Sequence, residues 1–204
     1  MLPHNIKEKI DGLKIEPLYD YHRSGDEVNI IENKYILKIS DNIYRLQQEM
    51  EKDTWVSKYV STPKPIIFIV ENNKAYYLRE CIEGEILCLP KFINNPVKVI
   101  DWLVEGINIL HNVKIVDDYE YVVDEGYNTL IHGDYCLPNI LVKNDKINGF
   151  VDLGGAGIGD PWRDYAWCIW SLEYNLGTKE YTPLLLEKLG IEFNREKFDL
   201  YTKD

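Results

Sequence analysis

The chain is poor in cysteine and has no long apolar run, and each absence argues against a class of protein. Its 204 residues include four cysteines, which form no Cys-x-x-Cys pair and lie near no histidine at zinc-ligand spacing. A disulfide framework and a structural zinc site are therefore not indicated, and we expect reduced, buried thiols. The longest apolar stretch, Pro65 to Val70, is too short to cross a membrane, and the first residues lack the apolar segment of a signal peptide. We expect a cytoplasmic protein without a membrane partner.

Positive charge is also scarce. The chain has 23 Lys and Arg against 34 Asp and Glu, which gives a formal net charge of −11. Proteins that bind nucleic acids normally carry a basic face, so we expect no nucleic-acid partner, and a cationic small molecule suits this field better. The hydrophobic content of 45% and the charged content of 28% are ordinary for a folded protein. The length allows one large domain or two small lobes.

The first eighty residues alternate short β-branched and aromatic runs with turn residues. This pattern predicts two hairpins, with strands over Glu27–Ile31, Lys34–Ile39, Ile66–Val70 and Ala75–Leu78. Between the hairpins, Ile43, Leu46 and Met50 recur at helical spacing, which predicts a helix over 43–59 with Ser40 or Asp41 as its cap. The expected order is β-β-α-β-β, a small antiparallel sheet with one helix packed on it.

The rest of the chain has mainly helical patterns. Asn95 followed by Pro96 predicts the start of a helix, and further helices are expected over 164–176 and 183–189, the last ending at Gly190. A third hairpin is predicted from strands over 140–143 and 149–151. The acidic segment Val116 to Asn128 is interpreted as a solvated connection.

The densest group of polar residues among apolar neighbours contains Asp134, Asn139 and Asp152. Asn139 and Asp152 bracket the third hairpin, so their side chains can point to one place. A carboxylate and an amide oxygen suit Mg²⁺, which prefers hard oxygen ligands. Asp134 precedes Asn139 by four intervening residues, which lets one group meet the metal while the other meets a substrate hydroxyl. Taken singly, each residue could be a turn or capping residue, and it is the set that indicates catalysis.

The same residues resemble a known catalytic loop. In protein kinases an Asp, four variable residues and an Asn precede an Asp-Phe-Gly motif whose Asp binds metal. Asp134, Asn139 and Asp152-Leu153-Gly154 reproduce this spacing, with His132-Gly133 before the first Asp. This variant is similar to the aminoglycoside phosphotransferase family, of the kanamycin kinase type. The resemblance continues through residues 159–166 and 184–191.

The resemblance implies a fold and a division of the chain. The fold is α+β and bilobal, as in protein kinases, with a small antiparallel sheet and one helix in the N-terminal lobe and a mostly helical C-terminal lobe. The implied parts are a nucleotide-binding lobe over 1–79, a hinge over 80–84, and a catalytic and substrate lobe over 85–204. We expect a monomer.

The resemblance also implies the roles of the loop residues. Asp134 would be the catalytic residue that positions and deprotonates the acceptor hydroxyl. Asn139 and Asp152 would hold Mg²⁺ on the phosphates of ATP or GTP. His132 is interpreted as a hydrogen-bonding residue that holds the loop rather than as a base, and Asp160 and Asp164 as residues that brace it. The remaining histidines, including His111, have no partner that the sequence indicates.

Nucleotide contacts are implied in the N-terminal half. Lys38 would neutralise the α- and β-phosphates, and Glu49 on the following helix would orient it. Without the catalytic loop, they would be interpreted as an edge-strand lysine and a solvated helix position. Ser24 belongs to a loop that would cover the phosphates, although it could also be a simple turn residue. The hinge, Glu80-Cys81-Ile82, would read the purine through its backbone.

One departure from the family pattern concerns the acceptor. Family members carry a longer helical insert before the catalytic loop, and only Val116 to Asn128 fills that place here. An aminoglycoside is the expected substrate. The alternatives are a kinase for choline, a sugar or another antibiotic, a non-catalytic nucleotide-binding regulatory protein, and a metal-dependent hydrolase that uses His132, Asp134 and Asp152. Ile36 stands where some relatives stack an aromatic ring on adenine, so ATP and GTP are both open as donors.

Overall fold

The computed structural model describes residues 2–18, 26–115 and 120–203, and it divides the chain into two compact units. Unit 1 comprises residues 1–83 and unit 2 comprises residues 84–204. Ser24, together with part of the acidic segment that was interpreted as a solvated connection, lies outside the described residues. The two units are described separately below.

Unit 1 is built on a five-stranded antiparallel sheet whose strand order is β1-β2-β3-β5-β4. Its strands are β1 (Ile15–Pro17), β2 (Glu27–Ile31), β3 (Tyr35–Ser40), β4 (Pro65–Glu71) and β5 (Lys74–Glu80). Both predicted hairpins are present. Since β3 lies between β2 and β5, Lys38 is in the middle strand of the sheet rather than on an edge.

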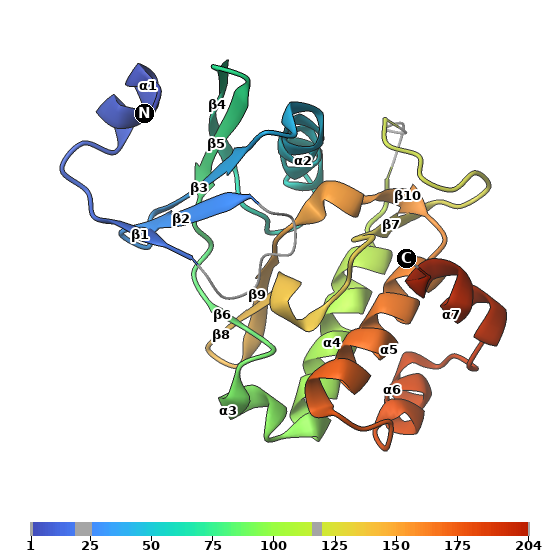
Figure 1. Cartoon of the computed structure of the whole chain (residues 1–204). Helices are drawn as coiled ribbons and strands as arrows, with labels where there is room; N and C mark the ends of the chain where they lie inside the picture. The colour runs from blue at the N-terminus through green and yellow to red at the C-terminus, as the bar shows by residue number, and fades with distance from the viewer. Residues whose placement is uncertain (1, 19–25, 116–119, 204) are drawn as a thin grey trace. The chain divides into compact units, whose positions relative to one another are not determined.

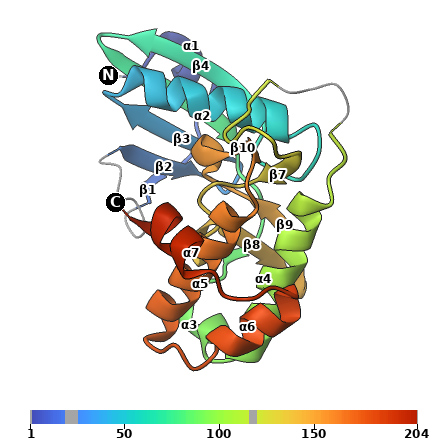
Figure 2. The same ribbon diagram turned by 90° about the vertical axis from the view of Figure 1, so that its right-hand side faces the viewer.

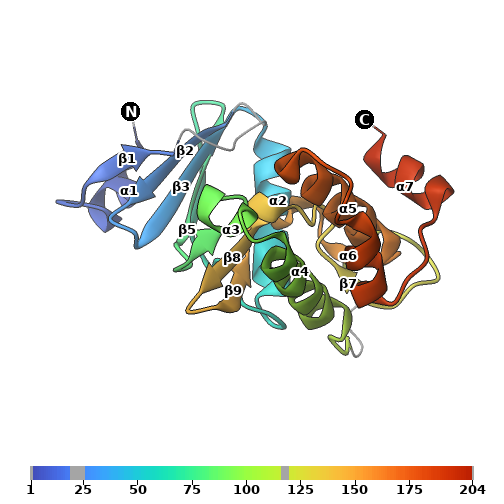
Figure 3. The same cartoon turned by 90° about the horizontal axis from the view of Figure 1, so that it is seen from below.

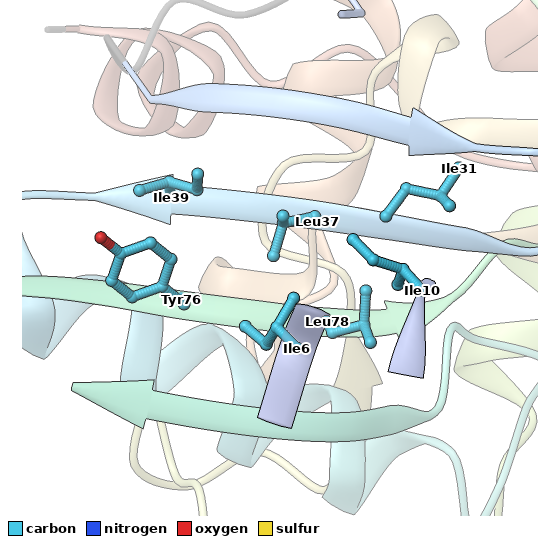
Figure 4. Close-up of a cluster of buried hydrophobic side chains, with 7 residues drawn as sticks. All are labelled: Ile6, Ile10, Ile31, Leu37, Ile39, Tyr76 and Leu78. Carbon is cyan, nitrogen blue, oxygen red and sulfur yellow. The ribbon is translucent and has the colours of Figure 1, made fainter. Parts of the chain in front are cut away.

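Each face of this sheet is covered by one helix, because its strands alternate apolar residues between the two sides. Short α1 (His4–Lys9) covers one face, where Ile6 and Ile10 pack against Leu37 of β3 and Leu78 of β5 (Figure 4). On the opposite face lies α2 (Ile43–Val56) (Figure 2). Its Leu46 belongs to a second apolar cluster with Ala75 and Tyr77 of β5. The sheet is therefore sandwiched, and the residues of β3 and β5 that face α2 share a buried environment.

Three hairpin turns follow one geometric rule. Each turn has two consecutive residues with positive φ, at 32–33, 72–73 and 144–145. This is the type I′ geometry, whose twist matches that of the flanking strands and which Asn and Asp tolerate better than most residues. All three turns were predicted from the sequence, and the third joins β8 (Ile140–Lys143) to β9 (Lys146–Phe150).

Unit 2 is mainly helical. The long helices α4 (Pro96–His111) and α5 (Trp162–Leu176) lie side by side, and α7 (Arg195–Thr202) packs against α5 (Figure 1 and Figure 3). Shorter helices are α3 (Pro90–Ile93) and α6 (Thr182–Leu189). Two small antiparallel sheets complete the unit, one ordered β6-β8-β9 and one ordered β10-β7, where β6 is Glu85–Ile86, β7 is Thr129–Ile131 and β10 is Gly157–Gly159. Several of the polar residues considered next follow β7, β9 and β10, and Asn139 directly precedes β8.

Several predicted boundaries differ from the structure. Helix α2 ends at Val56 rather than at Tyr59. Its cap is Asn42, whose side-chain oxygen accepts a hydrogen bond from the backbone N–H of Arg45, rather than Ser40 or Asp41. No sequence pattern predicted α1, α3, α7, β1, β6, β7 or β10. Most of these have six residues or fewer, which is too short for a periodic pattern to develop.

The expectation of buried thiols is met at three of the four cysteines. All four cysteines lie in the described part of the chain and are free thiols, of which three are buried and Cys81 is half-buried. Within the described residues, no helix combines the length and the apolar character that a bilayer crossing requires.

We expect Ile6→Ala to destabilise unit 1, because the Ile6 side chain is fully buried between α1 and the sheet. Removing a buried isoleucine typically costs about 2–4 kcal/mol of unfolding free energy. Ile15→Ala is the matched control, since Ile15 of β1 is 43% exposed and its truncation should change stability by less than about 0.5 kcal/mol. Thermal unfolding followed by circular dichroism measures both, and equal effects would contradict the packing role of α1.

Candidate active site

The loop that carries Asp134 is fixed by one buried carboxylate. Asp164, in the first turn of α5, accepts the backbone N–H of His132 on Oδ2 at 3.0 Å and that of Gly133 on Oδ1 at 2.8 Å. The Nε2 atom of His111, the last residue of α4, lies 2.9 Å from Oδ2. Asp164 is fully buried, so these contacts satisfy a group that would otherwise be costly to bury. They confirm the interpretation of Asp164 as a brace, and they correct the expectation that His111 has no partner.

His132 ties the start of the loop to the residue before Asp152. Its ring is fully buried, with Nδ1 accepting the backbone N–H of Asp134 at 3.3 Å and Nε2 donating to the carbonyl of Val151 at 3.0 Å. Both ring nitrogens are therefore engaged with the backbone. This supports the structural interpretation of His132 and leaves no ring nitrogen for proton transfer or for metal binding.

Asp134 is held by two side chains from its own loop. Asn139 Nδ2 donates to Asp134 Oδ2 at 3.0 Å and to the Asp134 carbonyl at 2.9 Å. Cys136 Sγ donates to Asp134 Oδ1 at 3.1 Å. Burial, together with the nearby Asp134 charge, raises the pKa of the Cys136 thiol, so this group stays protonated and keeps donating. The Asp134 carboxylate is thus fixed in orientation while remaining partly exposed.

Asp152 is brought to the same end of the loop by the backbone. The N–H of Val151 donates to the carbonyl of Asn139 at 3.0 Å, which continues the β8–β9 pairing and places Asp152 one residue further on. Asp152 itself adopts a left-handed conformation, with φ of 60° and ψ of 53°, at the start of the 3-10 turn over 153–155. Residues in this region are rare outside turns and are often found at functional sites.

The donor set at this end of the loop fits a magnesium ion. Because the Asn139 amide directs its N–H₂ group at Asp134, its carbonyl oxygen Oδ1 is the atom that could bind a metal ion. An amide oxygen and the Asp152 carboxylate are hard donors of the kind that Mg²⁺ binds together with waters and phosphate oxygens. Among the described residues there is no cluster of three or more His, Cys, Asp or Glu that could enclose a metal by itself. A metal held here would thus depend on ligands from a bound nucleotide.

A second carboxylate, Asp160, joins α7 to the segment before the catalytic loop. Its Oδ1 accepts the Trp162 N–H at 3.0 Å, while Oδ2 receives Lys197 Nζ at 2.6 Å and the hydroxyls of Tyr127 and Tyr201, both at 3.0 Å. These donors hold the pKa of Asp160 below its usual value despite its burial. These four contacts are to the start of α5, to α7 and to Tyr127, and none of them is to residues 132–139, so they do not support the expected bracing of the catalytic loop by Asp160.

The acidic segment is less solvated than expected. Asp124 accepts a bidentate pair of hydrogen bonds from Arg163 of α5, at 2.7 and 2.9 Å, and this contact lowers the pKa of Asp124. Its Oδ2 also accepts the N–H of Asp160 at 3.0 Å. A planar guanidinium can pair with both oxygens of one carboxylate. This end of the segment is therefore bound to α5 rather than freely solvated.

In unit 1, Lys38 and Glu49 form a buried ion pair. Lys38 Nζ donates to Glu49 Oε1 at 2.6 Å, and both side chains are about 5% exposed. The pairing register explains the encounter, since Lys38 lies opposite Tyr77 in the β3–β5 ladder and both face α2. The strand lysine and the helix glutamate singled out in the sequence are thus brought together by the sheet and the helix that covers it.

The expected hinge residues have part of their backbone already engaged. The Glu80 N–H donates to the Lys64 carbonyl and the Cys81 N–H to the Lys34 carbonyl, both at 2.9 Å. Burial raises the pKa of the half-buried Cys81 thiol. A purine edge would therefore have to be read by the N–H of Ile82 and by backbone carbonyls. Ser24, the expected phosphate-loop residue, is outside the described part of the chain.

Sequence reasoning missed the residues that support these groups. Arg79 and Asp53 extend the Lys38–Glu49 pair, and the Ser171 hydroxyl of α5 accepts the Leu137 N–H of the catalytic loop at 3.0 Å. A signal existed for Asp53, which follows Glu49 by one helical turn and therefore shares its face. Ser171 gave none, because it is an ordinary polar position in the pattern of a long helix.

We expect Gly133→Ala to lower stability. Gly133 has φ of 81°, and a Cβ atom there would stand 2.2 Å from the carbonyl oxygen of Gly155. Because the neighbour is backbone, the loop and the turn after Asp152 would have to separate, at a cost of about 2 kcal/mol or more. Gly154→Ala is the control, since open space surrounds that position. Thermal unfolding compares the two, and equal midpoints would contradict the close approach of the two segments.

Asp53 predicts a pH dependence of stability. Burial, opposed by the charge of Arg79, raises the pKa of Asp53 to about 6. Because this pKa is higher in the folded protein than in the unfolded chain, the folded state binds the Asp53 proton more tightly. The free energy of unfolding that this proton adds is therefore lost as the pH rises through about 6. From about pH 5 to about pH 7.5 the wild type should therefore lose about 1 kcal/mol more than Asp53→Asn. Denaturant unfolding at several pH values tests this, and parallel curves would contradict it.

Comparison with known proteins points to one family. The model of a phosphotransferase enzyme family matches residues 118–201, which include the catalytic loop. A protein of Lactococcus lactis named probable aminoglycoside 3'-phosphotransferase is 28% identical over 233 positions, covering 92% of this chain and 87% of the relative. The aminoglycoside 3'-phosphotransferase of Enterococcus faecalis is 27% identical and covers 83% of each chain.

Solved structures agree on the fold. Aminoglycoside phosphotransferase APH(3'')-Id from Streptomyces rimosus, solved in complex with ADP and streptomycin, superposes with a TM-score of 0.77 at 17% identity. The match covers 96% of this chain and 93% of that one. The chain therefore has the protein-kinase-like fold of the aminoglycoside phosphotransferases, and the sequence matches agree with the resemblance seen in the loop that carries Asp134.

Proposed function

We propose that the protein transfers the γ-phosphoryl group of ATP or GTP to a hydroxyl of an aminoglycoside antibiotic, in a Mg²⁺-dependent reaction. The observation that carries the proposal is the fixed orientation of the Asp134 carboxylate by Asn139, at the end of a loop that also brings Asp152 close. The buried Lys38–Glu49 pair of unit 1 supports it, because phosphoryl transfer needs a cation on the α- and β-phosphates.

The roles of the residues follow from their contacts. Asn139 Oδ1 and Asp152 would hold Mg²⁺, which neutralises charge on the phosphates when it is bound. Lys38 binds the α- and β-phosphates, and Glu49 orients its ammonium group. Asp134 accepts a hydrogen bond from the acceptor hydroxyl, aims its oxygen at the γ-phosphorus and takes its proton. Because the transition state is loose, positioning and charge neutralisation supply most of the rate, and the base contributes modestly.

The net charge and the sequence similarity to named relatives support an aminoglycoside as the acceptor. The formal net charge of −11 attracts polycations, and the relatives from L. lactis and E. faecalis carry the name aminoglycoside 3'-phosphotransferase. Phosphorylation of a drug hydroxyl would remove one site of recognition by its target and thereby give antibiotic resistance. The cytoplasm, where ATP and GTP are available, is the compartment in which this reaction would occur.

A kinase for another small hydroxyl compound is the second candidate, and one observation favours it. The alignment with the L. lactis relative spans 233 positions, which is more than the 204 residues of this chain. The chain therefore lacks segments that the relative contains within the matched region, and this difference favours a different acceptor. The hydrolase alternative is disfavoured because both nitrogens of His132 are engaged with the backbone.

We expect drug-stimulated release of ADP or GDP that depends on Mg²⁺ and on Asp134. Asp134→Ala should lower turnover by about 10²–10⁴ and leave nucleotide affinity unchanged, because Asp134 contacts the acceptor rather than the nucleotide. Asp152→Ala should reduce both turnover and Mg²⁺-nucleotide affinity. A coupled assay with a panel of aminoglycosides measures turnover, and calorimetry measures nucleotide affinity.

Asp145→Ala is the matched control for these variants, since Asp145 lies in the exposed β8–β9 turn and pairs with Lys98. It should change neither quantity. Equal losses of nucleotide affinity in the Asp134 and Asp152 variants would contradict the division of roles. Stimulation by choline or a sugar, with none by any drug, would move the proposal to the second candidate.

A further inference from the structure

Glu49 is paired with two cations rather than one. Its Oε1 atom receives Lys38 Nζ at 2.6 Å and Arg79 Nη1 at 3.0 Å. Arg79 belongs to β5, where it lies opposite Ile36 of β3 and so faces α2 on the same side as Lys38. All three charged side chains are 6% exposed or less, so water does little to screen their interaction.

Arg79 is itself held by a second carboxylate of the same helix. Its Nη1 donates to Asp53 Oδ2 at 2.9 Å, and the hydroxyl of Tyr77 donates to the same oxygen at 2.7 Å. Asp53 follows Glu49 by one turn of α2 and is fully buried. Arg79 Nη1 therefore bridges two successive carboxylates on one helix face, and it is fixed there independently of Lys38.

This arrangement changes the consequence of moving Lys38. A buried carboxylate that loses its sole cation is strongly destabilised, because the charge stays in a poorly solvated place. If Lys38 were the sole cation on Glu49, sharing its ammonium group with phosphates would incur part of that penalty. With Arg79 in place, Glu49 keeps a counter-charge while Lys38 shifts.

We propose that Arg79 is a positioning residue that holds Glu49 and compensates its charge when Lys38 engages the nucleotide phosphates, and that Asp53 and Tyr77 fix Arg79 for this purpose. The part that concerns phosphates rests on the proposed function. The charge compensation itself is a property of unit 1, and it can be tested without any nucleotide.

The first test removes the Lys38 charge by the substitution Lys38→Met. The Lys38→Met substitution is introduced into two background variants, Asp53→Asn and Asp53→Asn/Arg79→Met. These two variants differ only at residue 79. Both lack the Asp53 charge, so Arg79 is removed without leaving that carboxylate unpaired. Lys38→Met should lower the thermal midpoint at least twice as far in the background without Arg79. Equal losses in the two backgrounds would overturn the proposal.

Lys34→Met is the matched control, because Lys34 at the start of the same hairpin strand is exposed and pairs with Glu32. It should shift the midpoint equally little in both backgrounds. If the Asp53→Asn/Arg79→Met protein does not fold, Asp53→Asn/Arg79→Gln, which retains a polar side chain, takes its place in the same comparison.

The second test measures the affinity of Mg²⁺-ATP and Mg²⁺-GTP in the two backgrounds with Lys38 intact. Without Arg79, nucleotide should bind about tenfold more weakly, because Lys38 could then share its ammonium group with phosphates only by leaving the Glu49 charge undercompensated. Equal affinities would overturn the proposal while leaving the proposed function standing. A wild-type protein that binds neither nucleotide would contradict the proposed function, and the midpoint comparison would still decide on Arg79.

Discussion

The candidate site depends first on the buried carboxylate of Asp164. The backbone N–H groups of His132 and Gly133 donate hydrogen bonds to its two oxygens, and the His111 ring of α4 contacts one of them. This contact ties the start of α5 to the turn from which Asp134 projects. Catalysis by positioning requires such rigidity, because a displacement of about 1 Å can cost a factor of about a hundred in rate. The hydrogen bonds from Asn139 and Cys136 then orient a carboxylate whose backbone is already fixed.

Unit 1 follows the same principle with charges instead of backbone groups. Its sheet separates two environments: α1 closes an apolar cluster on one side, and α2 closes a side that contains Lys38, Glu49, Arg79 and Asp53. Burial makes each of these charges depend on its partners, so none can move without consequences for the next. The proposed binding of nucleotide phosphates by Lys38 therefore depends on the whole cluster and not on one ion pair.

Much of this arrangement could be predicted from the sequence, and the reasons for the rest are physical. The three Asn- and Asp-containing hairpin turns and the start of α4 after Asn95 are encoded locally, so they were predicted correctly. The spacing of Asp134, Asn139 and Asp152 indicated the catalytic loop for the same reason. Contacts such as Asp124 with Arg163, or Arg79 with Asp53, join residues far apart in the chain and depend on tertiary packing. Single residues in α4 and α5, such as His111 and Ser171, gave no pattern at all.

The central claim is that Asp134, Asn139 and Asp152 direct a phosphoryl group onto an acceptor hydroxyl. The most direct test is to identify the product by mass spectrometry and phosphorus NMR after incubation with Mg²⁺, ATP or GTP, and an aminoglycoside. The account predicts a drug that carries one additional phosphoryl group as a monoester, formed in step with nucleoside diphosphate. Free phosphate alongside an unmodified drug would contradict it, because the nucleotide would then be hydrolysed rather than used for transfer.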